Sequence, residues 1–176
     1  MRAPLFEMVL RTPELDRSRY PKLNHLNYPF GGTIGVGVRS AGKRNHAGWD
    51  LYAEPNTPTF AITGGRIVQT GTMHGYGNIV LLEFIFQNRT LYALYAHLSS
   101  AAFHPHHGKP VEVTEGTRVG LTGTTGNAAG EPPHLHFEIW TKRNVGHFPD
   151  GRISPGEVLG YIYDNMDNRL PNANLG

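Results

Sequence analysis

The sequence predicts an all-β domain built from short antiparallel strands. Three observations support this prediction: runs three to nine residues long that are rich in β-branched and aromatic residues, glycine-bearing turns between them, and no apolar period of 3.6 residues over a useful length. The chain also shows no internal repeat of solenoid length. We therefore expect an antiparallel β-sheet or sandwich domain.

Nine segments are expected to form strands, and one turn can be placed between the two longest. Gln87, Asn88 and Arg89 predict a hairpin, and Thr63-Gly64-Gly65 predicts another turn. The expected strands are residues 33–38, 49–53, 59–62, 66–70, 78–86, 90–97, 111–113, 118–121 and 134–141.

The chain divides into an irregular front, a domain and a polar tail. Prolines at positions 4, 13, 21 and 29 prevent a long helix in residues 1–30, which we interpret as an N-terminal extension. Residues 31–163 form the expected domain, and residues 164–176 are rich in asparagine and poor in bulky apolar side chains. A chain of 176 residues can bury roughly 70% of its unfolded surface without disulfides.

Two histidines lie one residue apart in the last expected long strand. Side chains alternate between the faces of a strand, so His134, His136 and Glu138 share one face while apolar residues take the other. By itself a His-x-His pair is more often a pair of surface residues than a pair of metal ligands. Glu138 is either a hydrogen-bond partner of one of these histidines or a plain surface carboxylate.

Two further segments strengthen the case for a metal site. His46 and Asp50 are four residues apart, and Gly48 between them removes a side chain and allows a sharp fold there. In the run 92–98, alternation places Tyr95 and His97 on one face; the alternative is a core strand ending in a buried histidine. The chain has no cysteine, which excludes disulfides and cysteine-type zinc sites and leaves histidine and aspartate as ligands.

The order of these motifs resembles the lysostaphin-like (LytM, M23) zinc metallopeptidases. The resemblance runs from about residue 31 to residue 161. It includes His-x-x-x-Asp at 46–50, Tyr-x-His-Leu at 95–98, the glycine-rich stretch 120–127 and His-Leu-His-Phe-Glu at 134–138. The connection at residues 128–133 is longer than the tight turn of many members, so the shape of that loop is left open.

The resemblance implies a role for each site residue. It implies that His46, Asp50 and His136 bind one Zn²⁺ per chain, and that His97 and His134 are catalytic histidines outside the ligand set. A catalytic zinc with three protein ligands keeps its fourth position for water or substrate. Which histidine is the general base and which stabilises the oxyanion is left open. Tyr95 and Asn127 are candidate substrate contacts, with a partly buried sheet tyrosine as the alternative for Tyr95.

By the same resemblance we expect a zinc endopeptidase that hydrolyses peptide cross-links or bridges of bacterial peptidoglycan. Stem peptides or cross-bridges would be its substrates, and groove loops rather than ligands decide between a D,D cross-link and a glycyl bridge. Two other classes are considered: a catalytically inactive relative that binds a partner, and a non-catalytic β-barrel binding module with adventitious histidines. An inactive relative normally lacks a ligand, and none is missing here.

Charge and targeting signals bear on partners and location. Residues 1–45 carry eight Lys or Arg and three Asp or Glu, an excess that favours an anionic partner such as a wall polymer, or else a solvated arm. Basic residues do not interleave with aromatics, so nucleic acid is not expected.

No membrane span and no secretory signal are expected. Action at the periplasmic or extracellular wall would then require phage lysis, a secretion machine or a removed signal, and a delivered toxin would have an inhibitory or immunity protein.

The remaining polar residues give weaker predictions. Asn24, His25 or Asn27 could reach the metal or the groove and restrain activity, although packing is the simpler role. The histidines around Pro105, at positions 104, 106 and 107, are interpreted as an exposed cluster that binds stray metal rather than as a second designed site.

Overall fold

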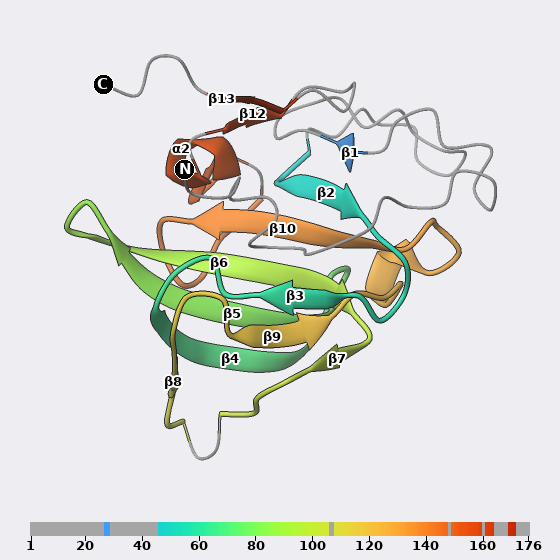
Figure 1. Cartoon of the computed structure of the whole chain (residues 1–176), viewed down its shortest axis with the longest axis horizontal. Coiled ribbons are helices and arrows are strands. Elements are labelled where there is room, and N and C mark those ends of the chain that lie inside the picture. Colours follow the sequence, from blue (N-terminus) through green and yellow to red (C-terminus); the bar gives the residue numbers. More distant parts are fainter. Residues whose placement is uncertain are drawn as a thin grey trace.

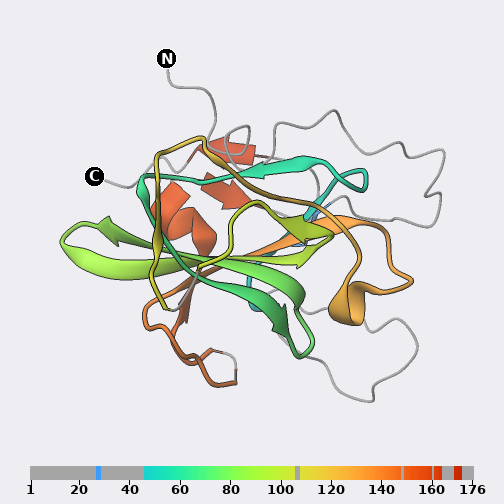
Figure 2. The ribbon, with the colours of Figure 1, turned by 90° about the horizontal axis from the view of Figure 1, so that it is seen from below.

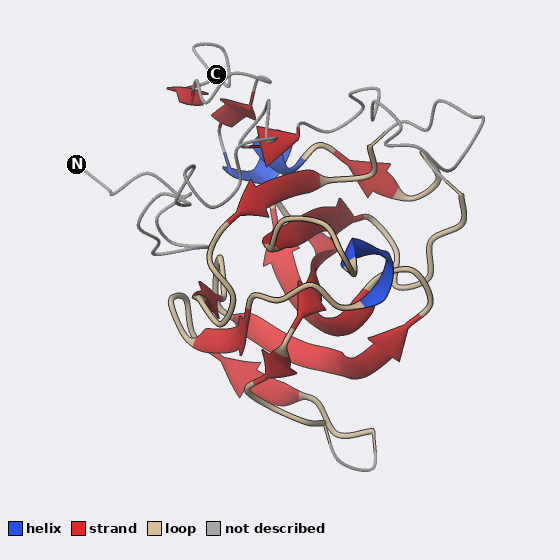
Figure 3. Cartoon of the chain, turned by 90° about the vertical axis from the view of Figure 1, so that its right-hand side faces the viewer, coloured by secondary structure: helices blue, strands red, loops and turns tan. Residues whose placement is uncertain are grey.

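A computed structural model describes residues 27–28, 46–105, 108–147, 149–159, 161–163 and 169–171. Strands make up most of these residues, and the helices among them are one short 3-10 turn, η1 (Gly126–Ala128), and one α-helix, α2 (Pro155–Leu159) (Figure 3). The fold class expected from the sequence is therefore confirmed.

The main sheet has eight strands, and every pairing in it is antiparallel. Its order is β1-β2-β10-β6-β5-β4-β8, with β11 added against β10 (Figure 1). The strands are β1 (Asn27–Tyr28), β2 (Trp49–Tyr52), β4 (Gly65–Met73), β5 (Gly77–Phe86), β6 (Arg89–Leu98), β8 (Val111–Val113), β10 (His134–Trp140) and β11 (Arg152–Ile153).

A smaller sheet packs against one face of the main sheet. It has the order β3-β9-β7, with β3 (Pro58–Phe60), β7 (Ser100–Ala101) and β9 (Arg118–Leu121), and lies in front of β4 and β5 in the view of Figure 1. The larger core cluster joins the two sheets, because it combines Val119 of β9 with Leu51, Tyr95 and Phe137 of the main sheet. Burial of these apolar side chains is the main favourable term for the sandwich.

A second, smaller core lies on the opposite face of the main sheet. It contains Ile79, Leu81, Leu94, Ala96 and Trp140, all nearly inaccessible to solvent. Because neighbouring residues of a strand face opposite ways, the two clusters divide the side chains of β5, β6 and β10 between them. His134, His136 and Glu138 alternate along β10 with Leu135, Phe137 and Ile139 of the larger core, so the histidines face the side of the smaller core.

A bulge at His97 changes which face of the sheet the side chains near the end of β6 point to. Asn78 is opposite Leu98 and Val80 is opposite Tyr95, so β6 has one more residue than β5 in this interval. His97 takes up the extra residue with a φ of 59°, a left-handed conformation that is uncommon outside glycine. Tyr95 and Leu98 consequently both pack into the larger core.

The expectation that Tyr95 and His97 share a face is therefore wrong. The ring of His97 lies 5.0 Å from that of His134 and 5.6 Å from that of His136, on the opposite side of the sheet from Tyr95. Strict alternation along a strand predicted the shared face, and the bulge reverses that alternation.

Eight of the nine expected strands are present in the described residues. Two have the expected bounds, and six have one or both ends shifted by one to three residues. The predicted hairpin is also present: Gln87 and Asn88 have φ of 47° and 59° and connect Phe86 to Arg89, which is the first residue of β6. This hairpin of β5 and β6 extends beyond the body at one end in Figures 1 and 2. The sequence missed elements of two to five residues, which are too short to give a clear pattern. These are β1, β7, β11, η1, α2 and the strands at residues 161–163 and 169–171.

The ends of the chain are only partly described. β1 pairs with β2, and β12 (Tyr161–Tyr163) pairs with β13 (Arg169–Pro171). The expected strand 33–38, Asn24, His25, His106 and His107 lie outside the described residues, as do most of the extension 1–30 and of the tail 164–176. The domain boundaries at residues 30 and 163 stay predictions. In the described part of the chain, no helix has the length and apolar character to cross a membrane.

Replacing Tyr95 by phenylalanine tests whether this residue serves the core. Its hydroxyl donates to the carbonyl oxygen of Phe60 at 3.0 Å and accepts the N–H of Ile62 at 3.1 Å. Tyr95→Phe leaves both buried groups without this partner, so we expect the free energy of unfolding to fall by about 1–3 kcal/mol, measured by urea denaturation. The half-buried Tyr92 gives a matched control, and Tyr92→Phe should change stability by only about 0.5 kcal/mol. Equal midpoints for the two variants would contradict this account.

Candidate metal centre

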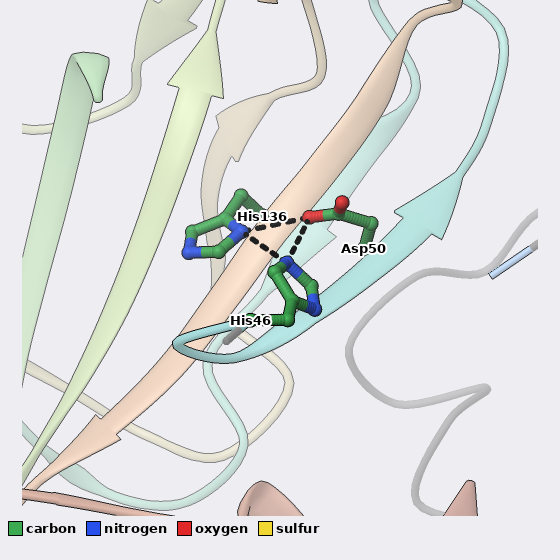
Figure 4. A group of neighbouring side chains, drawn as sticks. All are labelled: His46, Asp50 and His136. Atoms are coloured by element: carbon green, nitrogen blue, oxygen red, sulfur yellow. Dashed lines mark hydrogen bonds and ion pairs between the residues drawn. The ribbon is translucent and has the colours of Figure 1, made fainter. Parts of the chain in front are cut away.

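Strand pairing brings three potential metal ligands together. In the antiparallel pair of β2 and β10, Asp50 is directly opposite His136. His46 precedes β2, and its ring lies against that of His136 with centroids 5.0 Å apart. The three side chains converge at one point (Figure 4).

The ligand atoms have separations compatible with one ion. His46 Nε2 lies 3.0 Å from Asp50 Oδ1 and 3.2 Å from His136 Nδ1, and His136 Nδ1 lies 2.7 Å from Asp50 Oδ1. In a tetrahedral site with bonds of about 2.0–2.1 Å, ligand atoms are about 3.3 Å apart. Two imidazoles and one carboxylate are also a typical protein ligand set for a catalytic zinc. The residues present therefore fit such an ion.

Gly48 allows this approach because it has no side chain, which is one of the two reasons expected from the sequence. A Cβ at position 48 would lie 2.2 Å from the carbonyl oxygen of Phe137 and 2.8 Å from Cγ of Glu138. The backbone of residues 46–50 therefore lies directly against β10, and any side chain at this position would separate the two strands. What the site requires of Gly48 is the absence of a Cβ, because no left-handed φ is found there.

Two further histidines lie beside the three potential ligands. The rings of His97 and His134 are 5.0 Å apart, and His134 Nε2 is 3.8 Å from Asp50 Oδ1. Each ring binds a backbone carbonyl through Nδ1 at 2.8 Å: His97 that of Thr125, and His134 that of Pro132. A carbonyl oxygen can only accept, so both Nδ1 atoms carry the proton and both Nε2 atoms have a lone pair when the rings are neutral.

The electrostatics of the site follow from burial and from the crowding of these rings. Burial, with the nearby His136 and His134, lowers the pKa of His97 to about 3, so this imidazole is neutral at pH 7. Burial alone would raise the pKa of Asp50, but His134, His46 and the hydrogen bond from His136 hold it well below its usual range. Asp50 is therefore an ionised carboxylate, as a metal ligand must be.

Glu138 is a buried partner of His136 rather than a surface carboxylate. Its side chain is fully buried, and Oε1 lies 2.8 Å from His136 Nε2. Burial would raise the pKa of Glu138, but hydrogen bonding to His136 and the charges of His136 and Arg152 lower it to about 2. The carboxylate is ionised and accepts Nε2–H, which turns Nδ1 of the same ring toward Asp50 and His46.

Residues 44–147 match the model of peptidase family M23. This match covers more than half of the 176 residues. The chain belongs to peptidase family M23. The match contains all five residues expected to act in the site, namely His46, Asp50, His97, His134 and His136.

Two curated relatives of this M23 chain are endopeptidases. The chain is 33% identical over 94 residues to the peptidoglycan DD-endopeptidase ShyA of Vibrio cholerae, which covers 53% of this chain and 20% of that protein. It is 35% identical over 122 residues to the glycyl-glycine endopeptidase ALE-1 of Staphylococcus capitis, which covers 68% of this chain and 30% of that protein. The chain thus spans less than a third of the length of either relative.

A solved structure supports the M23 fold. The catalytic domain of the antimicrobial peptidase lysostaphin from Staphylococcus simulans superposes with a TM-score of 0.60 at 27% identity. The superposition covers 77% of this chain and 92% of that domain. The lysostaphin-like fold expected from the sequence is therefore confirmed.

The other residues singled out in the sequence differ in their exposure to solvent. Tyr95 is fully buried in the core behind the sheet, so the prediction that it contacts substrate is wrong. Asn127 is exposed in η1, where its N–H donates to the carbonyl oxygen of Gly75, and its substrate contact stays a prediction. His104 is exposed, with Thr70 Oγ1 at 3.5 Å from Nδ1.

Sequence reasoning missed the groups that orient the site residues. Thr125 and Pro132 act through backbone carbonyls, which carry no sequence signal. Tyr76 and Arg152 bind Glu138 from segments 62 and 14 residues away along the chain, and only the folded sheet brings them together.

Replacing Gly48 by alanine tests the close approach of residues 46–50 to β10. The added methyl group displaces His46 and Asp50 from His136, and a catalytic constellation must hold its geometry within about 0.5 Å. We expect the zinc affinity of Gly48→Ala, measured by titration calorimetry, to fall by roughly tenfold or more. Gly64 is the matched control, because a Cβ there would meet only the carbonyl oxygen of Val113 at 3.7 Å. Unchanged affinity in Gly48→Ala would contradict this account.

Proposed function

We propose that this M23 chain is a zinc-dependent endopeptidase that hydrolyses peptide cross-links or bridges of bacterial peptidoglycan. One observation carries the proposal: three ligand atoms converge within 3.2 Å of one another beside two histidines whose Nδ1 atoms each bind a backbone carbonyl. The name of the relative ShyA supports peptidoglycan as the substrate class, and the name of ALE-1 supports a glycyl-glycine bond as one candidate for the bond cleaved.

In the proposed site, His46 Nε2, Asp50 Oδ1 and His136 Nδ1 hold one zinc ion per chain. When bound there, zinc would activate water and polarise a substrate carbonyl. Only three protein ligands come from the described residues, which is the number typical of a catalytic rather than a structural zinc.

His97 and His134 are assigned to proton transfer and oxyanion stabilisation. Hydrolysis adds water to the carbonyl carbon, breaks the C–N bond and moves one proton from water to the leaving amine. A neutral imidazole with its Nε2 lone pair directed at the site can accept that proton and later donate it. Once protonated, the same Nε2–H can donate a hydrogen bond to the developing oxyanion. Thr125 and Pro132 hold both rings in the tautomer that these steps need.

The substrate class sets where the protein acts. Peptidoglycan lies outside the cytoplasmic membrane, so the proposed site of action is the periplasm or the extracellular wall. If the chain is a toxin delivered to other cells, an inhibitory or immunity protein would protect the producing cell. An inactive relative is the second function class, and the complete set of five residues argues against it.

Two substitutions separate metal binding from catalysis. His136→Ala removes a proposed ligand, so both zinc content and hydrolysis should be lost. His134→Ala removes a proton-transfer group, so hydrolysis should fall by roughly 100- to 10,000-fold while zinc content stays near one per chain. Zinc is measured by elemental analysis and hydrolysis by release of fragments from purified walls. His74 is exposed, and His74→Ala serves as the control that should keep both properties. Normal hydrolysis by His134→Ala would refute its role.

Digestion of two wall types tests the reaction itself. Peptidoglycan with direct D,D cross-links and peptidoglycan with glycyl bridges are incubated separately with the protein, and released fragments are identified by mass spectrometry. We expect new amino termini in at least one digest, abolished by a chelator and restored by Zn²⁺. No release from either wall in the presence of zinc would overturn the proposed function in favour of an inactive relative.

A further inference from the structure

Behind His136 lies a buried polar cluster that the proposed chemistry does not use directly. It consists of Glu138, Trp140, Tyr76 and Arg152. Glu138 Oε1 accepts from His136 Nε2 and from the Tyr76 hydroxyl, each at 2.8 Å. Glu138 Oε2 accepts from Arg152 Nε at 2.7 Å and from the indole N–H of Trp140. A buried carboxylate is tolerated only when its oxygens are satisfied in this way.

Arg152 connects this carboxylate to its surroundings. Its side chain is only 6% exposed, and it donates through Nε to Glu138, through Nη2 to the Tyr76 hydroxyl at 3.0 Å, and through Nη1 to the carbonyl oxygen of Gly146 at 2.7 Å. The guanidinium carbon also lies 5.8 Å from the ring centroid of Trp140. Three nitrogens in one rigid plane thus fix three groups at once, which a lysine ammonium on a flexible stem cannot do.

The position of Arg152 follows from the sheet. In the pair of β10 and β11, Arg152 is directly opposite Trp140, so it is the diagonal neighbour of Glu138. Tyr76 reaches the same carboxylate from the turn between β4 and β5, and its backbone carbonyl accepts the N–H of His97 at 2.9 Å. The cluster therefore contacts both His136 and the backbone of His97.

We propose that Arg152, acting through Glu138, is a positioning residue of the metal centre, and that it locks the ring of His136 so that Nδ1 faces His46 and Asp50. The Glu138 carboxylate must accept Nε2–H of His136, because the opposite edge of that ring provides the ligand atom. Arg152 and Tyr76 hold the two carboxylate oxygens in the orientation that this contact requires. This inference rests on the proposed function, since it assumes that His136 binds zinc.

A purely structural ion pair is the competing explanation. Buried ion pairs often contribute little to stability, and removal of one partner is destabilising whatever the site does. The two explanations differ in what they predict for the folded protein. A positioning residue changes zinc affinity and ligand geometry, whereas a structural pair changes only the free energy of unfolding.

The test compares zinc binding by the full chain and by three variants. Zinc dissociation constants are measured by competition with a chromophoric chelator, for the wild type, Arg152→Met, Arg152→Lys and Lys142→Met. We expect Arg152→Met to bind zinc roughly 10- to 100-fold more weakly, with a smaller loss in Arg152→Lys because charge is kept but the planar fork is not. Lys142 pairs with Asp150 on the exposed surface of the same loop at 2.7 Å, so Lys142→Met should bind zinc like the wild type.

Cobalt substitution gives a second readout that a structural pair would not change. Replacement of zinc by Co²⁺ makes the ligand field visible, and we expect the absorption bands of Arg152→Met to shift relative to the wild type while those of Lys142→Met do not. If Arg152→Met fails to fold, Tyr76→Phe removes one hydrogen bond to Glu138, and it should weaken zinc binding in the same direction.

The outcomes separate the two proposals. A wild type that binds no zinc overturns the proposed function. A wild type that binds zinc, together with folded Arg152→Met or Tyr76→Phe of equal affinity and unchanged cobalt spectrum, overturns the positioning role alone.

Discussion

The site depends on one pairing, that of β2 with β10. In that register Asp50 is opposite His136, and Gly48 lies against the carbonyl oxygen of Phe137. A shift by one residue would turn every side chain of β2 to the other face and remove Asp50 from the metal centre. The apolar partners prevent such a shift, because Trp49 and Leu51 are 1–2% exposed in the core. Hydrophobic burial of Trp49 and Leu51 therefore fixes the position of Asp50 between them.

The second half of the site depends on an irregularity rather than on regular pairing. His97 faces the metal centre only because the bulge in β6 adds one residue to the strand. Tyr95 and Leu98 on either side anchor the bulge from the core, and the carbonyl oxygen of Thr125 holds the ring from the other side. Bulges are common next to active sites because they redirect a side chain without interrupting the sheet for long.

Sequence reasoning was most successful where local chemistry and period carry the information. The alternation 134–141 gave β10 and the shared face of His134, His136 and Glu138, and the spacing of His46 and Asp50 gave a pair that the structure brings to His136. It failed at Tyr95, because a bulge leaves no mark in composition. It also missed Arg152 and Tyr76, since their contacts with Glu138 exist only after distant segments pair. The family resemblance predicted all five site residues, whereas the residues that orient them became apparent only in the folded structure.

The φ of 59° at His97 has a consequence for the stability of the fold. A β-carbon in this region of backbone space costs on the order of 1 kcal/mol, and glycine or asparagine would occupy it with less strain. Selection for a sturdier fold alone would favour replacing the imidazole there. The histidine at this position therefore lowers the stability of the fold while it places an imidazole beside the metal centre, and both effects arise at a single backbone position.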